Sequence, residues 1–185
     1  TWYMMLFQDH GAQGRMPVLV PVEWQDGLPL PGKVPAVLET DVDEKLPRLY
    51  ASDSLRGGIS PLWQWNHEPD WSKIAFTGQG LQLTCGGLAG HVEQARNTLT
   101  QKCFGKKCSC AVQVDGKDLQ EGDFAGICAL QGCFAQLCMT IRDGKRFLSF
   151  VTRQPGENDD VWHSRELPRE EVLLPVEQTT ITLRA

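Results

Sequence analysis

Apolar and polar residues alternate with a period of two in several short segments of this chain, which is the pattern of β-strands with one buried face. Near the start, the apolar run "WYMMLF" is typical of a buried strand. The next run, "MPVLVPVEW", places Val18, Val20, Val22 and Trp24 along a second strand, and "QDGLPLPG" closes the segment with turn residues. Two strands alone do not form an independent core, so residues 1–32 must belong to a larger sheet or pack on later parts of the chain.

From about residue 55 onward the pattern is nearly all β. The dipeptide Asp143-Gly144, between two alternating runs, is the strongest hairpin signal in the sequence. Other expected strands are "GLQLTC", "CSCAVQV", "FAGICAL", "AQLCMTI", "VWHSREL" and "TTITLRA". Short strands at regular spacing, with almost no helical periodicity, predict an all-β fold, an antiparallel β-sandwich of jelly-roll type. Helix is expected only as a turn near "PREEV".

The two β segments are joined by a stretch without sustained periodicity. Residues 33–54 carry Pro35, Pro47 and a run of acids, which is typical of an extended connector lying on a surface. The sequence therefore predicts three parts: residues 1–32, 33–54 and 55–185.

The net charge and the lengths of the apolar runs argue against nucleic acid and membranes as partners. The 185 residues carry a net charge of −5, which gives no electrostatic reason to expect nucleic acid or an anionic membrane as a partner. No apolar run approaches the roughly 20 residues needed to span a bilayer, and the N-terminus lacks the pattern of a signal peptide. Because the sequence begins inside an expected strand and without Met, we expect a cut or processed N-terminus.

The chain has seven cysteines, at positions 85, 103, 108, 110, 128, 133 and 138. An odd count with no regular framework disfavours a disulfide-stapled secreted domain. No C-x-x-C pair is present, and Cys108 and Cys110 fall on one face of a strand, so no metal site and no cofactor are predicted. We expect buried, reduced cysteines that act as small hydrophobes, in a reducing compartment such as the bacterial cytoplasm.

The loop "FQDHGAQGR" is the first candidate for chemistry. Arg15 follows glycines at a strand end, where its guanidinium offers a rigid fork for paired hydroxyl or carboxylate oxygens. The same residues also fit an ordinary turn between two strands, and His10 has no assigned role.

The aromatic segment from Trp63 to Trp71, "WQWNHEPDW", has the most unusual composition in the chain. Indole faces stack on the apolar faces of pyranose rings, so the segment suits a sugar platform. The alternative is structural: Trp63 and Trp65 share one strand face and fill the core, while Asn66 and Pro69 shape a turn. Both interpretations stand at this point.

The acidic residues do not outline a catalytic pair. They cluster in polar, loop-like runs where solvated charge is expected: Asp41, Asp43, Glu44, Glu157, Asp159, Asp160, Glu170 and Glu171. The sequence has no Gly-rich phosphate loop, no G-x-S-x-G elbow and no H-E-x-x-H motif. A self-contained active site is therefore not visible, and no catalytic residue is assigned.

Several motifs together resemble a known family. The stretch "FQDHGAQGRMPVLVPVEWQDGLPLPG" resembles the closing portion of the catalytic five-bladed β-propeller of glycoside hydrolase family 43, the β-xylosidase and α-L-arabinofuranosidase group. The stretches "LWQWNHEPDWS", "ARNTLTQKCFGKKCSCAVQVD" and "GDFAGICALQ" resemble the C-terminal concanavalin A-like β-sandwich appended to many of those enzymes. The resemblance covers nearly the whole chain and implies two strands of the last propeller blade followed by a concanavalin A-like jelly roll.

The resemblance implies an inverting hydrolysis of terminal pentosides in xylo- or arabino-oligosaccharides. One Asp is the general base, a Glu is the general acid, and a second Asp tunes that acid, with acid and base roughly 6.5–9.5 Å apart to admit a water. No position of this chain matches those three carboxylates. The family's glycine-flanked arginine, which hydrogen-bonds the sugar, matches Arg15, and an aromatic on a sandwich loop that narrows the pocket matches Phe124.

The leading hypothesis is the C-terminal part of a family 43 glycosidase, inert alone, whose sandwich buttresses the active site. Because the family's sandwich continues beyond "TTITLRA" with several more strands, we expect either a sandwich that is incomplete at its C-terminus or one that depends on another polypeptide, such as the remaining propeller or a second copy. Two alternatives stay open: a carbohydrate-binding module using Trp63, Trp65 and Trp71, and a structural or oligomerising domain.

Overall fold

The computed structural model describes residues 2–11, 14–34, 48–104, 107–159 and 164–185. The chain divides into two compact units, residues 1–52 with 101–107 and residues 53–100 with 108–185. Most of the expected connector, residues 35–47, lies outside the described residues. Within the described ranges, no helix has the length and apolar character needed to cross a membrane.

The first unit contains a three-stranded antiparallel sheet in the order β1-β2-β3. Its strands are β1 at Tyr3–Asp9, β2 at Arg15–Gln25 and β3 at Leu28–Pro31. The first two confirm the prediction, whereas β3 corrects the expectation that "QDGLPLPG" is turn only. Asp26 and Gly27, with φ of +49° and +77°, form the two-residue turn of a β2–β3 hairpin. Proline is tolerated in β3 because it is an edge strand.

This first sheet buries little of its own surface. Val20 is buried, whereas Trp2, Met5, Phe7 and Trp24 are exposed. Trp2 and Trp24 meet edge to face, with ring centroids 6.5 Å apart. Regular strand pairing is therefore not accompanied by an apolar core among the described residues of this sheet.

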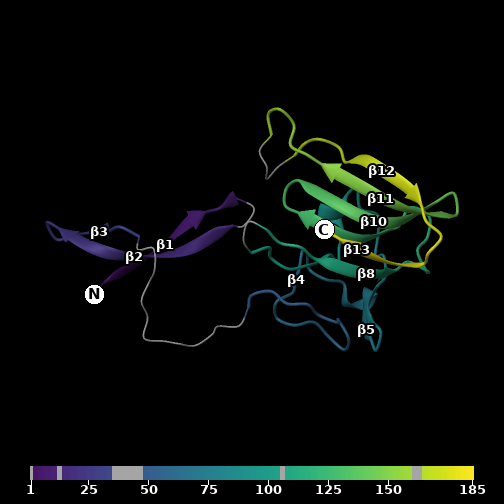
Figure 1. Ribbon diagram of the computed structural model, residues 1–185, viewed down its shortest axis with the longest axis horizontal. Coiled ribbons are helices and arrows are strands. Elements are labelled where there is room, and N and C mark those ends of the chain that lie inside the picture. The colour runs from purple at the N-terminus through teal and green to yellow at the C-terminus, as the bar shows by residue number, and fades with distance from the viewer. Residues whose placement is uncertain (1, 12–13, 35–47, 105–106, 160–163) are drawn as a thin grey trace. The chain divides into compact units, whose positions relative to one another are not determined.

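The second unit is built around a four-stranded antiparallel sheet in the order β12-β11-β10-β9 (Figure 1). Its strands are β9 at Phe124–Leu130, β10 at Phe134–Arg142, β11 at Lys145–Arg153 and β12 at Arg169–Pro175. The β10–β11 hairpin turns at Asp143 and Gly144, with φ of +50° and +68°, so that Arg142 lies opposite Lys145. The predicted Asp-Gly hairpin is confirmed.

A second, two-stranded sheet pairs β8 at Ala111–Asp115 with β13 at Thr180–Arg184. The buried apolar side chains of this unit are Phe134, Cys138, Met139, Ile141, Val151 and Leu183. Gly116, directly after β8, lies against the side chains of Met139 and Leu119, and a Cβ at this position would overlap both. The end of β8 therefore packs closely on β10, and the predicted all-β class is confirmed.

Two short two-stranded pairings, of which only β5–β6 is a hairpin, and two helical turns complete the second unit. They are β4 at Gln64–Trp65 with β7 at Leu99–Thr100, β5 at Ile74–Thr77 with β6 at Gly80–Leu83, and the 3-10 turns η2 at Trp71–Lys73 and η3 at Val92–Gln94. The helical turn expected near "PREEV" is wrong, because Arg169 to Val172 form the first half of β12. A bulge where β12 passes Phe150 and Val151 breaks the alternation that would have revealed the strand.

The segment "VWHSREL" is the second correction to the expected strands. Residues 161–163 lie outside the described residues, and Ser164 to Leu167 form no strand. The Asp159 carboxylate accepts a hydrogen bond from the Arg165 N–H at 2.7 Å, and the Ser164 hydroxyl donates to the Gln154 carbonyl at 2.7 Å. These local bonds hold the segment as a loop.

The cysteines are less buried than the sequence suggested. Cys138 is buried, and burial raises the pKa of its thiol to about 12. Cys85, Cys103, Cys108 and Cys110 are exposed, which corrects the expectation of small buried hydrophobes at these positions. Cys108 and Cys110 precede the first residue of β8, so they lie outside the packed part of that strand.

Candidate functional site

The loop that carries Arg15 is a β1–β2 hairpin turn built on two glycines. Gly11 and Gly14 have φ of +63° and +83°, a region that glycine adopts without strain. The His10 N–H donates to the Gly14 carbonyl at 3.0 Å, and the Gly14 N–H donates to the Gly11 carbonyl at 2.8 Å. The Asp9 carboxylate accepts from the Gly11 N–H at 2.8 Å. The loop therefore presents Arg15 at a defined strand end.

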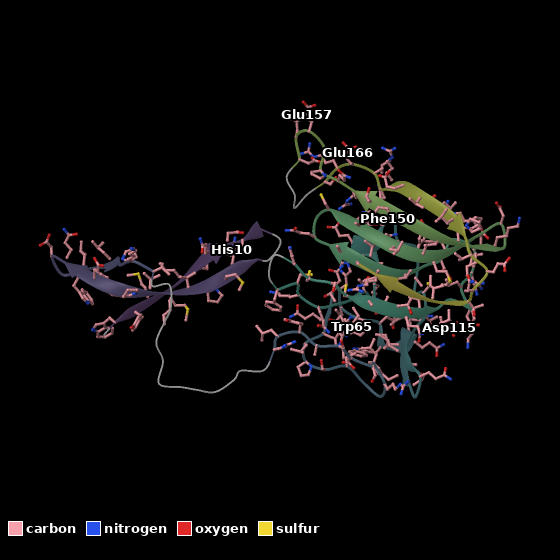
Figure 2. All side chains as sticks on the ribbon, viewed as in Figure 1. His10, Trp65, Asp115, Phe150, Glu157 and Glu166 are labelled. Atoms are coloured by element: carbon pink, nitrogen blue, oxygen red, sulfur yellow. The ribbon has the colours of Figure 1, made fainter. Side chains whose placement is uncertain are left out.

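The Arg15 side chain has two weak contacts, one with the Phe7 ring and one with the Asp9 carboxylate. Its guanidinium carbon lies 5.1 Å from the centre of the Phe7 ring, and its Nε lies 3.9 Å from an Asp9 carboxylate oxygen. Both charged side chains are largely exposed, so this contact leaves the guanidinium accessible to paired oxygens of a ligand. His10, labelled in Figure 2, is exposed and bonds through Nε2 to the Gln8 amide oxygen at 3.2 Å.

Phe124 is the first residue of β9 and lies opposite Thr140 of β10. It is exposed, and the turn before it is fixed by side-chain bonds. The Asp123 carboxylate accepts from the Gln120 N–H at 2.9 Å, and the Glu121 carboxylate accepts from the backbone N–H groups at the tip of the β10–β11 hairpin. Phe124 thus stands on a well-anchored corner of the second unit, whereas Arg15 belongs to the first unit.

Trp63 and Trp65 both have structural contacts. The Trp63 indole N–H donates to the Asp53 carboxylate at 3.0 Å. Backbone N–H groups of Leu55 and Ser60 bond to the same carboxylate and, with Trp63, hold the pKa of Asp53 below its usual value. Trp65, in β4, is half-buried and packs edge to face against Trp71. Of the three tryptophans, Trp71 is the exposed one.

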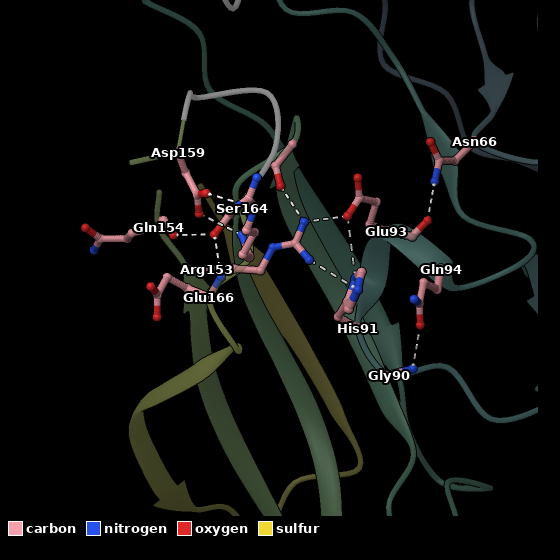
Figure 3. Close-up of polar contacts among 12 residues, drawn as sticks. Asn66, Gly90, His91, Glu93, Gln94, Arg153, Gln154, Asp159, Ser164 and Glu166 are labelled. Carbon is pink, nitrogen blue, oxygen red and sulfur yellow. Dashed lines mark hydrogen bonds and ion pairs between the residues drawn. The ribbon is translucent and has the colours of Figure 1, made fainter. Parts of the chain in front are cut away.

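A buried charged cluster that the sequence analysis missed surrounds Arg153 at the end of β11 (Figure 3). Arg153 is 7% exposed and donates to the Glu93 carboxylate and to the Gly132 carbonyl, each at 2.5 Å. It also bonds to His91 Nε2 at 3.2 Å and lies 5.3 Å from the centre of the Phe134 ring. The cluster ties the η3 turn to the ends of β10 and β11.

A second ionic contact crosses the four-stranded sheet. Arg142 makes two 2.8 Å bonds to the Glu170 carboxylate, which also accepts from the Ser149 hydroxyl at 2.5 Å. Burial acts to raise the pKa of Glu170, but the bonds from Ser149 and Arg142 outweigh it and lower the pKa below its usual value.

Glu170 and Asp159 were expected to be solvated charges, but both carboxylates are hydrogen-bonded within the protein. Glu170 is bound by Arg142 and Ser149, and the Asp159 side chain is buried and accepts backbone bonds. Both carboxylates serve local structure. In the part of the chain that the structure describes, no group of three or more His, Cys, Asp or Glu side chains is arranged to hold a metal ion.

A hollow of about 550 Å³ lies where the start of β11 meets the segment after β12. It is lined by Lys145, Arg146, Pro175, Val176, Glu177 and Gln178. None of the residues predicted for a site lines it.

The geometry defines an all-β sandwich unit accompanied by a small sheet that presents an arginine. A family model for the β-xylosidase C-terminal concanavalin A-like domain, GH43_C2, matches residues 56–185. The chain belongs to this family. The predicted resemblance and the concanavalin A-like fold are thereby confirmed.

Solved structures extend the likeness to the whole chain. A bifunctional GH43-CE protein of Bacteroides eggerthii is 36% identical with a TM-score of 0.82, and the alignment covers 99% of this chain and 24% of that one. An engineered GH43 glycoside hydrolase with endo-xylanase and exo-arabinofuranosidase activity is 27% identical with a TM-score of 0.78, covering 100% of this chain and 38% of that one.

A GH43_12 protein retrieved from a capybara gut metagenome shares the fold at 20% identity and a TM-score of 0.64, covering 92% of this chain and 35% of that one. A search of curated proteins gave no significant match. The chain thus spans between 24% and 38% of the length of the first two solved relatives.

Proposed function

We propose that this chain is the C-terminal portion of a glycoside hydrolase that releases terminal pentosides from xylo- or arabino-oligosaccharides with inversion. One observation carries the proposal. The relative from Bacteroides eggerthii aligns over 99% of the chain, and so reaches well into residues 1–55, which the family model does not match, yet the alignment fills only 24% of that relative. The engineered GH43 relative, which acts as an endo-xylanase and exo-arabinofuranosidase, supports the substrate class.

In this proposal, strands β1 to β3 are the last part of a catalytic β-propeller. Their exposed apolar side chains, among them Met5, Phe7 and Trp24, are covered by the neighbouring blades. The second unit is the sandwich that buttresses the propeller. Its own core makes it a rigid support for Phe124, which stands at the start of β9.

Arg15 and Phe124 are the proposed substrate contacts of the parent enzyme. The hairpin loop fixes the backbone of Arg15, and the exposed guanidinium can donate two parallel hydrogen bonds to sugar hydroxyls. Phe124 supplies an apolar wall on an anchored corner. The three carboxylates that an inverting mechanism requires have no counterpart in this chain, so the chain alone is expected to be inactive.

The first test is an assay of the purified chain with p-nitrophenyl β-D-xylopyranoside and p-nitrophenyl α-L-arabinofuranoside. We expect no hydrolysis above the buffer rate. Turnover that co-purifies with the chain would contradict the proposal, because the carboxylates it requires are absent.

The second arm uses the longer protein, obtained from the coding sequence upstream of Thr1. In that protein Arg15→Ala should lower kcat/KM for the preferred pentoside by about 100-fold, the loss expected for a charged hydrogen-bond pair. Arg48→Ala is the matched control, since Arg48 also lies over an aromatic ring, at 5.9 Å from the Tyr50 centroid. Equal effects of the two substitutions would contradict a sugar contact at Arg15.

A further inference from the structure

The exposed indole of Trp71 is a feature that the proposed function leaves unused. Among the described residues of the second unit, the aromatic side chains are buried or half-buried except for Phe124 and Trp71. Trp71 is 58% exposed. We infer that Trp71 is the centre of an oligosaccharide-binding platform carried by the sandwich itself.

Side-chain hydrogen bonds fix the backbone of the turn that carries Trp71. Asp70 caps η2, and its carboxylate accepts from the Ser72 N–H at 3.1 Å and from the Ser72 hydroxyl at 2.6 Å. The buried Asn97 side chain bonds to both backbone groups of Asp70, accepting from its N–H at 2.8 Å and donating to its carbonyl at 3.3 Å. The hydrogen bonds of Asp70 and Asn97 therefore fix the backbone of the turn that carries Trp71.

The ring itself is also braced. Trp65 meets Trp71 edge to face, with centroids 5.9 Å apart and an interplanar angle of 83°. This contact braces the Trp71 ring, and 58% of the residue remains exposed. A ring held in one orientation loses little conformational entropy when a ligand stacks on it. Trp65 lies at β4 in the lower part of the second unit in Figure 2.

Hydrogen-bonding side chains lie within and next to the turn that carries Trp71. Lys73 ends the same turn, and Arg96, which donates through Nε to the Glu68 carbonyl at 2.8 Å, lies near enough to stabilise the charge of Asp70. Ser72 follows Trp71 directly. An exposed indole with polar side chains in the same turn fits a pyranose ring, which has one apolar face and hydroxyls at its edge. The ligand class is therefore a neutral oligosaccharide of pyranose units.

The test titrates the whole chain with xylohexaose and, separately, cellohexaose by isothermal titration calorimetry. We expect the unsubstituted chain to bind xylohexaose, Trp71→Ala to weaken that binding by about tenfold or more, and Trp71→Phe to weaken it less. Trp24→Ala is the matched control. Trp24 is also 58% exposed and also meets a second tryptophan edge to face at 83°, but it belongs to the first unit. Its substitution should leave binding unchanged.

Thermal unfolding of each variant shows whether it folds. If Trp71→Ala does not fold, the xylohexaose affinity of Trp71→Phe is compared with that of the unsubstituted chain instead. The inference is overturned if the unsubstituted chain binds neither sugar, or if Trp71→Ala binds as tightly as the unsubstituted chain. A further variant, Arg15→Ala, separates the two proposals. If Arg15→Ala removes binding and Trp71→Ala does not, the platform is wrong while the sugar contact at Arg15 is supported.

Discussion

The two sheets of this chain have equally regular strand pairing and very different surroundings. In the first unit, β1 and β2 pair over seven consecutive residues, from Tyr3 opposite Pro21 to Asp9 opposite Arg15. In the second unit, β10 and β11 pair over nine residues, from Phe134 to Arg142. Yet β10 is buried along much of its length, whereas β1 is exposed along nearly all of it.

The two sheets show that strand pairing and the burial of an apolar core have different requirements. Alternation and a two-residue turn suffice to define a hairpin, but its stability in water requires that one face be covered. The second unit covers its sheet with side chains from its own strands. In the first sheet, the large apolar side chains remain exposed, as expected of a surface that packs against further protein.

The largest expected contrast comes from two methionines, one in each sheet. Met139 is fully buried and Met5 is 71% exposed. Met139→Ala removes buried volume and should lower the free energy of unfolding by about 2–5 kcal/mol, whereas Met5→Ala should change it by less than about 0.5 kcal/mol. Urea denaturation of both variants measures the two effects. Equal losses would show that the first sheet has a core of its own.

A smaller contrast comes from the ion pairs of the two units. Replacing Glu170 by Gln weakens the bonds from Arg142 and Ser149 and should cost about 1 kcal/mol at neutral pH. Asp9→Asn is the control, since the Asp9–Arg15 contact is long and exposed, and it should have no measurable effect on stability.

The pH dependence of this contrast has a definite sign. Because the folded-state pKa of Glu170 is lowered, its contribution is present above the ordinary carboxyl pKa of 4.5 and is lost as the pH falls through the folded-state pKa. Between about pH 5 and pH 3, the unsubstituted chain should therefore lose more stability than Glu170→Gln does. Parallel pH profiles for the two would contradict a role for this ionised pair.

The sequence predicted most of the strands because alternation and the Asp-Gly turn are local signals. The strands it missed include the short β5 and β7, β12, where a bulge beside Val151 interrupts the alternation, and β3, where prolines are acceptable only because the strand is at an edge. Such features depend on which strand lies alongside, and the sequence alone does not reveal that.

The candidate site was only partly accessible to sequence reasoning. Arg15 follows two glycines whose positive φ values fix the hairpin loop, so its position at a strand end could be predicted locally. The cluster around Arg153 could not be predicted, since its partners His91 and Glu93 lie about sixty residues earlier in the chain. Trp71 could not be distinguished from Trp63 and Trp65, because exposure depends on packing that composition does not encode.

The most direct test of the contrast between the two sheets is hydrogen–deuterium exchange of the whole chain, with mass spectrometry of peptides from β2 and from β10–β11. We predict that backbone amides of Arg15–Gln25 exchange much faster than those of Phe134–Arg153, because opening the first sheet exposes little new apolar surface. Equal protection of the two regions would contradict the account, since it would mean that the first sheet is stable without further cover.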